Sequence, residues 1–315
     1  MIGVVIATHN GQATIEATIA SVIAQTHQDL TCILIDDGST DGTADLARRL
    51  GDERFRVIGQ RNGGTSSARN RGLSQLPSAV DYVTFLDQDD VWEPDALEVL
   101  LAKATSDPSF VGAHGLGRFV DEGGRPFGDF ESFGRSRRTV SSGRDHPLAL
   151  DQPTTFASQL LTCTTFPPGL ILARRKVYDQ LGGFDPAIRL TEDWDMGLRL
   201  LRRGDLAFVD KVVIGWRRHG GNASSDSRMP DRYDQVRAKT FWSADNTPEQ
   251  QRLVREAWHV LQRGHARTHL QSAREHIKAG DVVDAADRLA RAGLASWRDL
   301  RGHPPRPRST TSSTR

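Results

Sequence analysis

The sequence predicts an α/β fold: a mostly parallel sheet with helices on both faces, followed by a C-terminal helical extension. Two observations lead to this prediction. In the first hundred residues, short apolar runs alternate with segments whose apolar residues recur at helical spacing, and this alternation is typical of parallel β-α units. From about Thr247 onward, the apolar residues recur at helical spacing only.

The early strands are expected at the apolar runs Ile2 to Ala7, Cys32 to Ile35, Phe55 to Ile58 and Tyr82 to Leu86. Between the first two runs, residues 15–23 carry apolar side chains on one helix face. Asp41 and Thr65 are expected to cap the next two helices. Pro94 suits the first turn of a fourth helix. The first hundred residues therefore hold four β-α units.

Residues 117–160 interrupt this alternation. They are rich in Gly, Ser, Arg and Pro and predict one long mobile loop. The later strands are expected at Gly169 to Ala173, Leu206 to Val209 and Val212 to Trp216. The C-terminal extension, residues 245–302, is expected to form three short helices. Residues 303–315 have the composition of a disordered tail.

Composition excludes several classes of protein. The only two cysteines, Cys32 and Cys163, rule out a disulfide framework and a cysteine-rich zinc site. No apolar run approaches the roughly 18 residues of a membrane span. Met1 is followed directly by a strand-like run, without the basic and apolar regions of a signal peptide. The sequence therefore predicts a cytoplasmic protein.

The net charge of +1 conceals an asymmetry along the chain. Residues 1–100 hold 15 Asp and Glu against 7 Arg, whereas residues 251–315 hold 13 Arg and Lys against 6 acids. The acidic part favours a site that recruits a cation, and no nucleic-acid partner is expected. The basic part is either a solvated helical face or a peripheral contact with a membrane surface or an acidic partner.

Polar clusters follow three of the expected strands. They are Thr8-His9-Asn10-Gly11, the run from Asp36 to Gly42, and Asp87-Gln88-Asp89-Asp90. Because ligands bind at the carboxyl ends of parallel strands, these clusters are expected to meet at one edge of the sheet. Carboxylates gathered there repel one another unless a cation compensates. An Asp-x-Asp pair suits Mg²⁺ or Mn²⁺.

An ordered series of motifs resembles family 2 glycosyltransferases, whose fold is called GT-A. The series is VVIATHNG, ILIDDGSTDGT, SSARNRGL, FLDQDDVWEPDAL, PPGLILARRKVYDQLGGFD, TEDWDMGLRL and WRRHGGNAS. The resemblance covers roughly residues 1–225. It implies a domain over 1–240, with a nucleotide-sugar-binding half at 1–116 and an acceptor half at 117–240. The C-terminal extension lies outside it.

The resemblance also implies a donor site and a Mn²⁺ or Mg²⁺ cofactor. The nucleotide would be bound by Thr8, Asn10, Asp37, Arg69 and Asp87. Among these, Asp37 would meet the base. The metal would be held by Asp89 and His219, while Asp87 either joins them or contacts the ribose or the sugar.

Asp193, in TEDWD, occupies the place of the general base in the family, with Glu192 and Asp195 as rival carboxylates. The chemistry needs few groups, because a sugar nucleotide is already activated. A divalent cation stabilises the departing diphosphate. A carboxylate accepts the proton of the acceptor hydroxyl as that hydroxyl attacks. One direct displacement of this kind inverts the anomeric carbon.

The resemblance therefore implies transfer of one sugar from a UDP- or dTDP-sugar to a hydroxyl of a glycan or a lipid-linked acceptor. GDP-sugars stay open. No Q-x-x-R-W element follows TEDWD, which disfavours a processive synthase. His9 stands where many relatives have Tyr, so the stacking contact with the base is left open.

Two other functions compete with this interpretation. A nucleotidyltransferase needs basic residues after the first strand to hold a triphosphate, but no Lys or Arg precedes Arg48. A nucleotide-sugar-binding module with a decayed site is the second alternative. The presence of Asp87, Asp89, Asp193 and His219 argues against decay.

Overall fold

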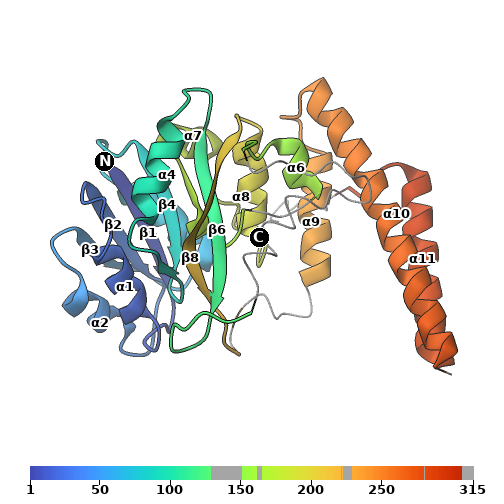
Figure 1. Cartoon of the computed structure of the whole chain (residues 1–315), viewed down its shortest axis with the longest axis horizontal. Helices are drawn as coiled ribbons and strands as arrows, with labels where there is room; N and C mark the ends of the chain where they lie inside the picture. Colours follow the sequence, from blue (N-terminus) through green and yellow to red (C-terminus); the bar gives the residue numbers. More distant parts are fainter. Residues whose placement is uncertain (129–150, 162–164, 221, 223–228, 280, 307–315) are drawn as a thin grey trace, which may run out of the picture.

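The computed structural model describes residues 1–128, 151–161, 165–220, 222, 229–279 and 281–306. The described residues form a mixed eight-stranded sheet with helices on both faces, and a helical hairpin projects from one end (Figure 1). The strand order is β3-β2-β1-β4-β7-β6-β8-β5. The predicted α/β fold with a C-terminal helical region is confirmed.

The strands are β1 (Ile2–Thr8), β2 (Leu30–Asp36), β3 (Phe55–Gly59), β4 (Tyr82–Asp87), β5 (Val91–Trp92), β6 (Gly112–Val120), β7 (Ile171–Arg174) and β8 (Leu206–Arg217). The helices of the domain are α1 (Ile15–Ile23), α2 (Thr43–Leu50), α3 (Thr65–Gln75), α4 (Ala96–Thr105), α6 (Phe156–Leu161), α7 (Arg175–Leu181), α8 (Glu192–Leu201) and α9 (Met229–Phe241). The hairpin consists of α10 (Pro248–Lys278) and α11 (Val282–Arg301).

Strands β1 to β4 pair in parallel, and their register brings the ends of three strands level. Thr8 lies beside Asp36, and Ala7 lies beside Asp87. The loops that carry the polar clusters therefore start from one edge of the sheet, as the sequence predicted. The first residues of two helices differ slightly from expectation. Helix α2 begins at Thr43, whose N–H donates to the carboxylate of Asp41, and Thr65 is the first residue of α3 rather than its cap.

The second half of the sheet mixes directions. Strand β7 is antiparallel to β4 and β6, whereas β6 and β8 are parallel. Strand β8 is continuous where two strands were predicted, and a register shift against β6 accommodates its charged middle. The predicted loop over 117–160 is wrong at both ends, because 117–120 belong to β6 and α6 begins at Phe156. Its centre, 129–150, lies outside the described residues.

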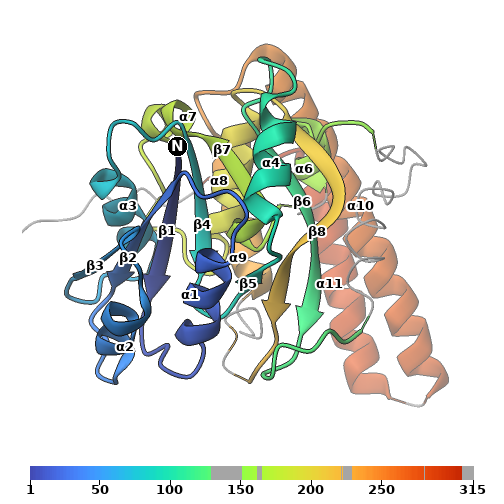
Figure 2. The same cartoon turned by 60° about the vertical axis from the view of Figure 1, so that its left-hand side comes forward.

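Side chains of each strand alternate between two cores, one on each face of the sheet. Val5 and Phe85 point into the core under α3, α7 and α8. Val4 and Leu86 belong to the core on the other face, which α1 and α4 cover (Figure 2). Both faces are therefore covered, which explains the nearly unbroken apolar runs of the central strands.

The C-terminal extension has two long helices where three short ones were predicted. The expected first and second helices are one continuous helix, α10. Its first half packs into the same core as α8 and α9 through Val254, Ala257 and Trp258. Its second half packs against α11 through residues such as Ala273. Residues 303–306 of the expected tail are described, and His303 and Pro304 lie against Trp242.

Candidate active site

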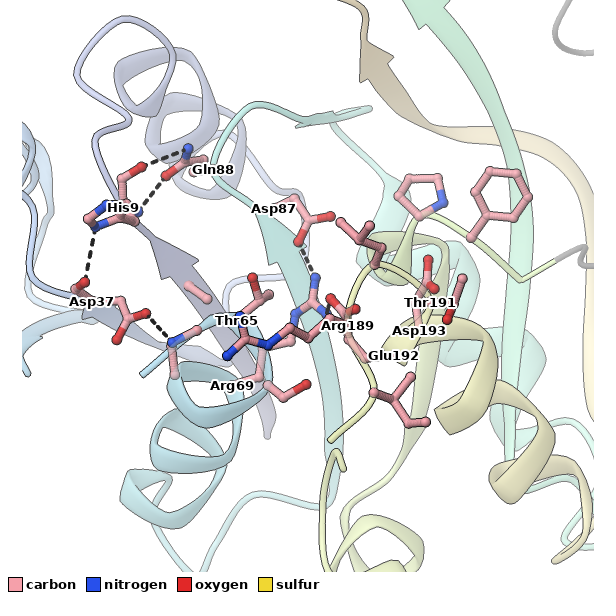
Figure 3. Close-up of a pocket in the computed structure, with 18 of the residues that line it drawn as sticks. His9, Asp37, Thr65, Arg69, Asp87, Gln88, Arg189, Thr191, Glu192 and Asp193 are labelled. Carbon is pink, nitrogen blue, oxygen red and sulfur yellow. Dashed lines mark hydrogen bonds and ion pairs between the residues drawn. The ribbon is translucent and has the colours of Figure 1, made fainter. Parts of the chain in front are cut away.

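A cavity of about 510 Å³ lies at the edge of the sheet where β1, β2 and β4 end. It is lined by the loop after β1, the first turn of α3, the loop after β4, residues 186–194 and the turn after β8. Figure 3 shows Asp37 and His9 at one end of the view, Arg69 and Asp87 in the middle, and Asp193 at the other end. Most predicted site residues are thus gathered around one cavity.

Asp37 is buried and organises the loop that precedes α3. Its Oδ1 accepts hydrogen bonds from the backbone N–H of Gly63 at 2.8 Å and from the side chain of Gln60 at 2.6 Å. Its Oδ2 accepts from the N–H of Gly64 at 2.8 Å. Gly64 has φ +85°, which favours glycine at this position. Asp37 therefore fixes the wall of the cavity beside His9.

Gln88 ties the loop after β4 to the loop after β1. The Thr8 hydroxyl donates to Gln88 Oε1 at 2.6 Å, and the N–H of His9 donates to the same atom at 2.8 Å. Asn10 lies elsewhere: its Oδ1 accepts from the N–H of Thr40 at 2.8 Å, and it does not line the cavity. Asn10 therefore braces the two loops from outside.

Arg69 is almost fully buried and joins the two sides of the cavity. Its guanidinium lies 2.5 Å from Asp87 Oδ1 and 3.1 Å from Glu192 Oε1. Burial opposes its charge, but the carboxylates of Asp87 and Glu192 outweigh burial and hold the pKa of Arg69 above its ordinary value. Arg69 thus links the end of β4 to the start of α8 and forms ion pairs with two of the carboxylates around the cavity.

Asp89 lies against the turn after β8. Its Oδ2 is 2.9 Å from His219 Nε2 and 3.4 Å from the amide nitrogen of Asn222. Burial, and then the nearby charge of Asp87, raise the pKa of Asp89. Burial also raises the pKa of Asp90 well above its ordinary value. An added cation here would relieve the repulsion among these carboxylates.

Arg217, which the sequence analysis did not single out, fastens this arrangement. Its backbone N–H donates to Asp90 Oδ1 at 3.1 Å, and its Nε donates to the carbonyl of Asp89 at 2.9 Å. Its Nη1 donates to the carbonyls of Asp121 and Glu122. One buried arginine therefore holds the loop after β4, the end of β6 and the end of β8 together.

The three carboxylates at the start of α8 have different environments. Asp195 is buried away from the cavity, with Lys239 Nζ at 2.8 Å, and Glu192 pairs with Arg69. Asp193 lines the cavity, and within the described residues it has no ion-pair partner. Burial, and then the charge of Glu192, raise its pKa to about 7. Asp193 is therefore the carboxylate best placed to take up a proton near neutral pH.

Comparison with known proteins agrees with this geometry. The sequence model described as "Glycosyl transferase family 2" matches residues 3–182, more than half of the chain. The chain belongs to glycosyltransferase family 2. This match, the level strand ends and the cavity confirm the family expected from the motif series.

Individual relatives match in part. The succinoglycan biosynthesis protein ExoW of Rhizobium meliloti is 49% identical over 82 residues, which are 25% of this chain and 26% of ExoW. S. aureus TarS 1-349 in complex with UDP-GlcNAc superposes with a TM-score of 0.57 at 17% identity, over 96% of this chain and 92% of that one. The mannosyltransferase PcManGT from Pyrobaculum calidifontis, in complex with GDP-Man and Mn²⁺, superposes with a TM-score of 0.58 at 19% identity. The superposition covers 96% of this chain and 79% of PcManGT. The two structures share the GT-A fold.

The residues of this glycosyltransferase fit a divalent cation at Asp89 and His219. A carboxylate oxygen and an imidazole nitrogen 2.9 Å apart are ligands that Mn²⁺ accepts. Asp87 is held by Arg69. The protein supplies two ligands here. A group of three potential ligand atoms within 4.8 Å of one another is found, in the described part of the chain, only at the α10–α11 turn, with His276, Asp281 and Asp284. The remaining ligands at Asp89 would be phosphate oxygens and water.

Arg189 also escaped the sequence analysis of this glycosyltransferase. It lines the cavity directly before Leu190, whose φ of +72° is unusual for a residue with a side chain. No short motif marks this position, because the turn depends on how α8 docks. Arg189 is among the cavity-lining residues drawn in Figure 3 and adds positive charge to an acidic cavity.

Proposed function

We propose that this enzyme transfers a single sugar from a nucleoside-diphosphate sugar to a hydroxyl group, with inversion at the anomeric carbon and with Mn²⁺ or Mg²⁺ as cofactor. The observation that carries the proposal is the placement of Asp193 and of the Asp89–His219 pair around one cavity. Asp37, Thr8 and Arg69 would hold the nucleotide end of the donor, with Asp87 beside its ribose or sugar.

The reaction needs one displacement. The acceptor oxygen attacks the anomeric carbon and forms the new C–O bond while the bond to the diphosphate oxygen breaks. The diphosphate leaves with the electron pair of that bond, and Asp193 takes the proton of the acceptor hydroxyl. A divalent cation, when bound by Asp89 and His219, stabilises the negative charge of the diphosphate. Glu192 is ion-paired with Arg69, so Asp193 is the carboxylate left to act as the general base.

UDP- and dTDP-sugars are the donors we propose, with GDP-sugars as the alternative. UDP-GlcNAc and GDP-Man occupy two proteins of the same fold, so the fold itself does not choose the base. Asp37 and His9 flank the base end of the cavity here, and Asp37 already accepts three hydrogen bonds. Recognition of the base therefore depends on the remaining acceptor capacity of Asp37 and on the ring of His9.

The acceptor we propose is a hydroxyl of a cell-surface glycan or of its lipid-linked precursor. Support comes from ExoW, a relative named for succinoglycan biosynthesis. None of the helices in the described ranges is long and apolar enough to cross a membrane. We also propose cytoplasmic action with peripheral contact to a membrane through the basic residues of α10 and the tail, which sedimentation with anionic vesicles tests.

The function is tested by turnover with UDP-, dTDP- and GDP-sugars in the presence of Mn²⁺. Release of a nucleoside diphosphate from one donor, and a product of opposite anomeric configuration by NMR, are expected. Asp193→Asn should abolish release, whereas Asp45→Asn, at an exposed acid of α2, should not. Tight nucleotide binding without turnover on any acceptor would favour the decayed module. Pyrophosphate release from a nucleoside triphosphate and a sugar phosphate would favour a nucleotidyltransferase.

A further inference from the structure

Helix α11 packs against α10 along one stripe of small residues. Ala285, Ala292 and Ala295 are buried on this side. The antiparallel register is held at one end by His259 Nδ1, 2.6 Å from Asp299 Oδ1. Helix α10 thereby covers one side of α11 (Figure 1), and Arg298 of α11 pairs with Asp234 of α9 at 3.1 Å.

A second apolar stripe runs along the open side of α11. Its members follow one another at steps of three and four residues through three heptads, and all of them are exposed: Val283, Ala286, Ala290, Gly293, Trp297 and Leu300. Val283 and Leu300 are 81% and 86% exposed, and Trp297 is 50% exposed. Val282, Leu289 and Leu294 widen this seam on its flanks and are exposed too. A soluble helix rarely leaves a contiguous apolar face of this length in water.

The spacing of the seam indicates that its partner is a helix. Alternating steps of three and four residues are the repeat of a coiled coil, in which each side chain packs between residues of a facing helix. The centre of the seam is small: a Cβ added to Gly293 would meet no atom within 4 Å, so another helix can approach closely. The charges do not favour a membrane, because α11 carries four Arg and three Asp.

The charged residues beside the seam indicate which helix is the partner. Asp287 and Arg301 occupy the same heptad position two heptads apart, and Leu294 lies midway between them. When two copies of α11 pair antiparallel about Leu294, Asp287 of each copy lies beside Arg301 of the other. A parallel pair would instead place Asp287 beside Val282 and Arg301 beside Ser296 of the other chain, so neither would meet an opposite charge. The helix is thus complementary to a second, reversed copy of itself.

We propose that this protein forms a homodimer in which the α11 seams of two chains pair as an antiparallel coiled coil, with one α10 helix on each outer side of the pair. The two cavities lie outside this contact, because the seam faces away from α10 and the cavity lies at the edge of the sheet. The proposal is therefore independent of the reaction proposed above.

Sedimentation equilibrium of the full chain tests the proposal. The expected mass is twice the 34.7 kDa of one chain. Ala290→Glu should return it to that of one chain, because a carboxylate would be buried at the centre of the seam. Gln271→Glu, which adds the same charge at an exposed position of α10, should leave the dimer intact. Unchanged circular dichroism and melting temperature of both variants would show that the chain stays folded.

A charge exchange tests the direction of pairing. Asp287→Arg alone should weaken the dimer by about tenfold or more in Kd, since it places two arginines together. Adding Arg301→Asp should restore it. A single-chain mass for the wild type, a dimer that survives Ala290→Glu, or binding of a monomer to anionic vesicles that Ala290→Glu removes would each overturn the proposal. Failure of the charge exchange to rescue would overturn the antiparallel arrangement.

Discussion

Asp193 lies in an environment that disfavours its ionised carboxylate, although the proposed reaction needs that form. It lines an open cavity, yet neighbouring protein atoms and the charge of Glu192 disfavour its ionised form and raise its pKa to about 7. The neighbouring acids avoid this cost, because Glu192 pairs with Arg69 and Asp195 pairs with Lys239. An acid whose ionised form is disfavoured inside a cavity is a mark of a functional group rather than of a structural one.

The pH dependence of turnover follows from this pKa. A general base must be ionised, so kcat/KM should rise about tenfold per pH unit below pH 7 and level off above it. A pH profile of diphosphate release measures this limb. Asp193→Asn should lower kcat by about a hundredfold or more at every pH. A profile that is flat between pH 5 and pH 8 would contradict the assignment of Asp193 as base.

The stability of the fold should decrease as pH rises, whereas turnover should increase. The pKa of Asp193 is about 7 in the fold, above its ordinary value of 3.8, so the folded chain binds more protons than the unfolded chain between these values. The fold is therefore destabilised as pH rises through this window. Asp193→Asn removes that cost, and its melting temperature should exceed that of the wild type at pH 8 but not near pH 4. Thermal melts of both proteins, with Asp45→Asn as control, give the comparison.

At the scale of elements, the pairing of β5 with β8 decides where His219 lies. Val91 pairs with Gly215, so the residues just before β5 meet those just after β8. Arg217 reinforces this contact, because its Nε donates to the carbonyl of Asp89 and its backbone N–H donates to the carboxylate of Asp90. The proposed metal ligands, Asp89 and His219, follow strands that are more than a hundred residues apart in sequence, and the sheet brings them together.

Arg217→Gln should therefore act on the metal and not on the nucleotide base. Loss of the contacts that orient Asp89 and His219 is expected to weaken Mn²⁺ binding by about 10- to 100-fold. The Mn²⁺ dependence of turnover measures this change. Arg218→Gln, at the next and more exposed position, serves as the matched control. Equal Mn²⁺ dependence in Arg217→Gln and the wild type would contradict the positioning role of Arg217.

Sequence patterns located the elements that are apolar and regular. Strands β1 to β4 were predicted to within two residues, because their runs are apolar on both sides and end in polar loops. Strand β6 was missed, since its sequence GAHGLGRFV holds three glycines and a histidine, whose fit depends on close neighbours such as β7. The motif series predicted that Asp87, Asp89 and Asp193 lie around one site, whereas the contacts of Arg217 depend on the tertiary structure.

The break predicted within α10 has a physical cause. Its apolar stripe runs through Leu253, Ala257 and Leu261 and then steps by five residues to Ala266. This phase shift looks like the end of one helix and the start of another. In the structure the helix continues, and the stripe changes partner, from the catalytic domain to α11.

At the scale of the whole molecule, the first half of α10 is part of the core of the glycosyltransferase domain. Trp258 of α10 is 3% exposed and belongs to the cluster that also contains Trp194 and Leu198 of α8. Trp258→Ala should therefore destabilise the catalytic domain by about 3–5 kcal/mol, whereas Leu270→Ala, on the exposed part of α10, should cost far less. Denaturant unfolding of the two variants measures the difference. Equal effects would mean that the hairpin is an independent appendage.

The proposed mechanism requires a metal-dependent nucleotide site that still binds nucleotide when the general base, Asp193, is removed. Calorimetric titration with UDP, dTDP and GDP, each with Mn²⁺ and with EDTA, tests this requirement most directly. The wild type should bind one nucleotide only when Mn²⁺ is present, Asp89→Ala should lose this binding, and Asp193→Asn should keep it. Nucleotide binding that survives Asp89→Ala, or the absence of binding to any nucleotide by the folded protein, would contradict the account.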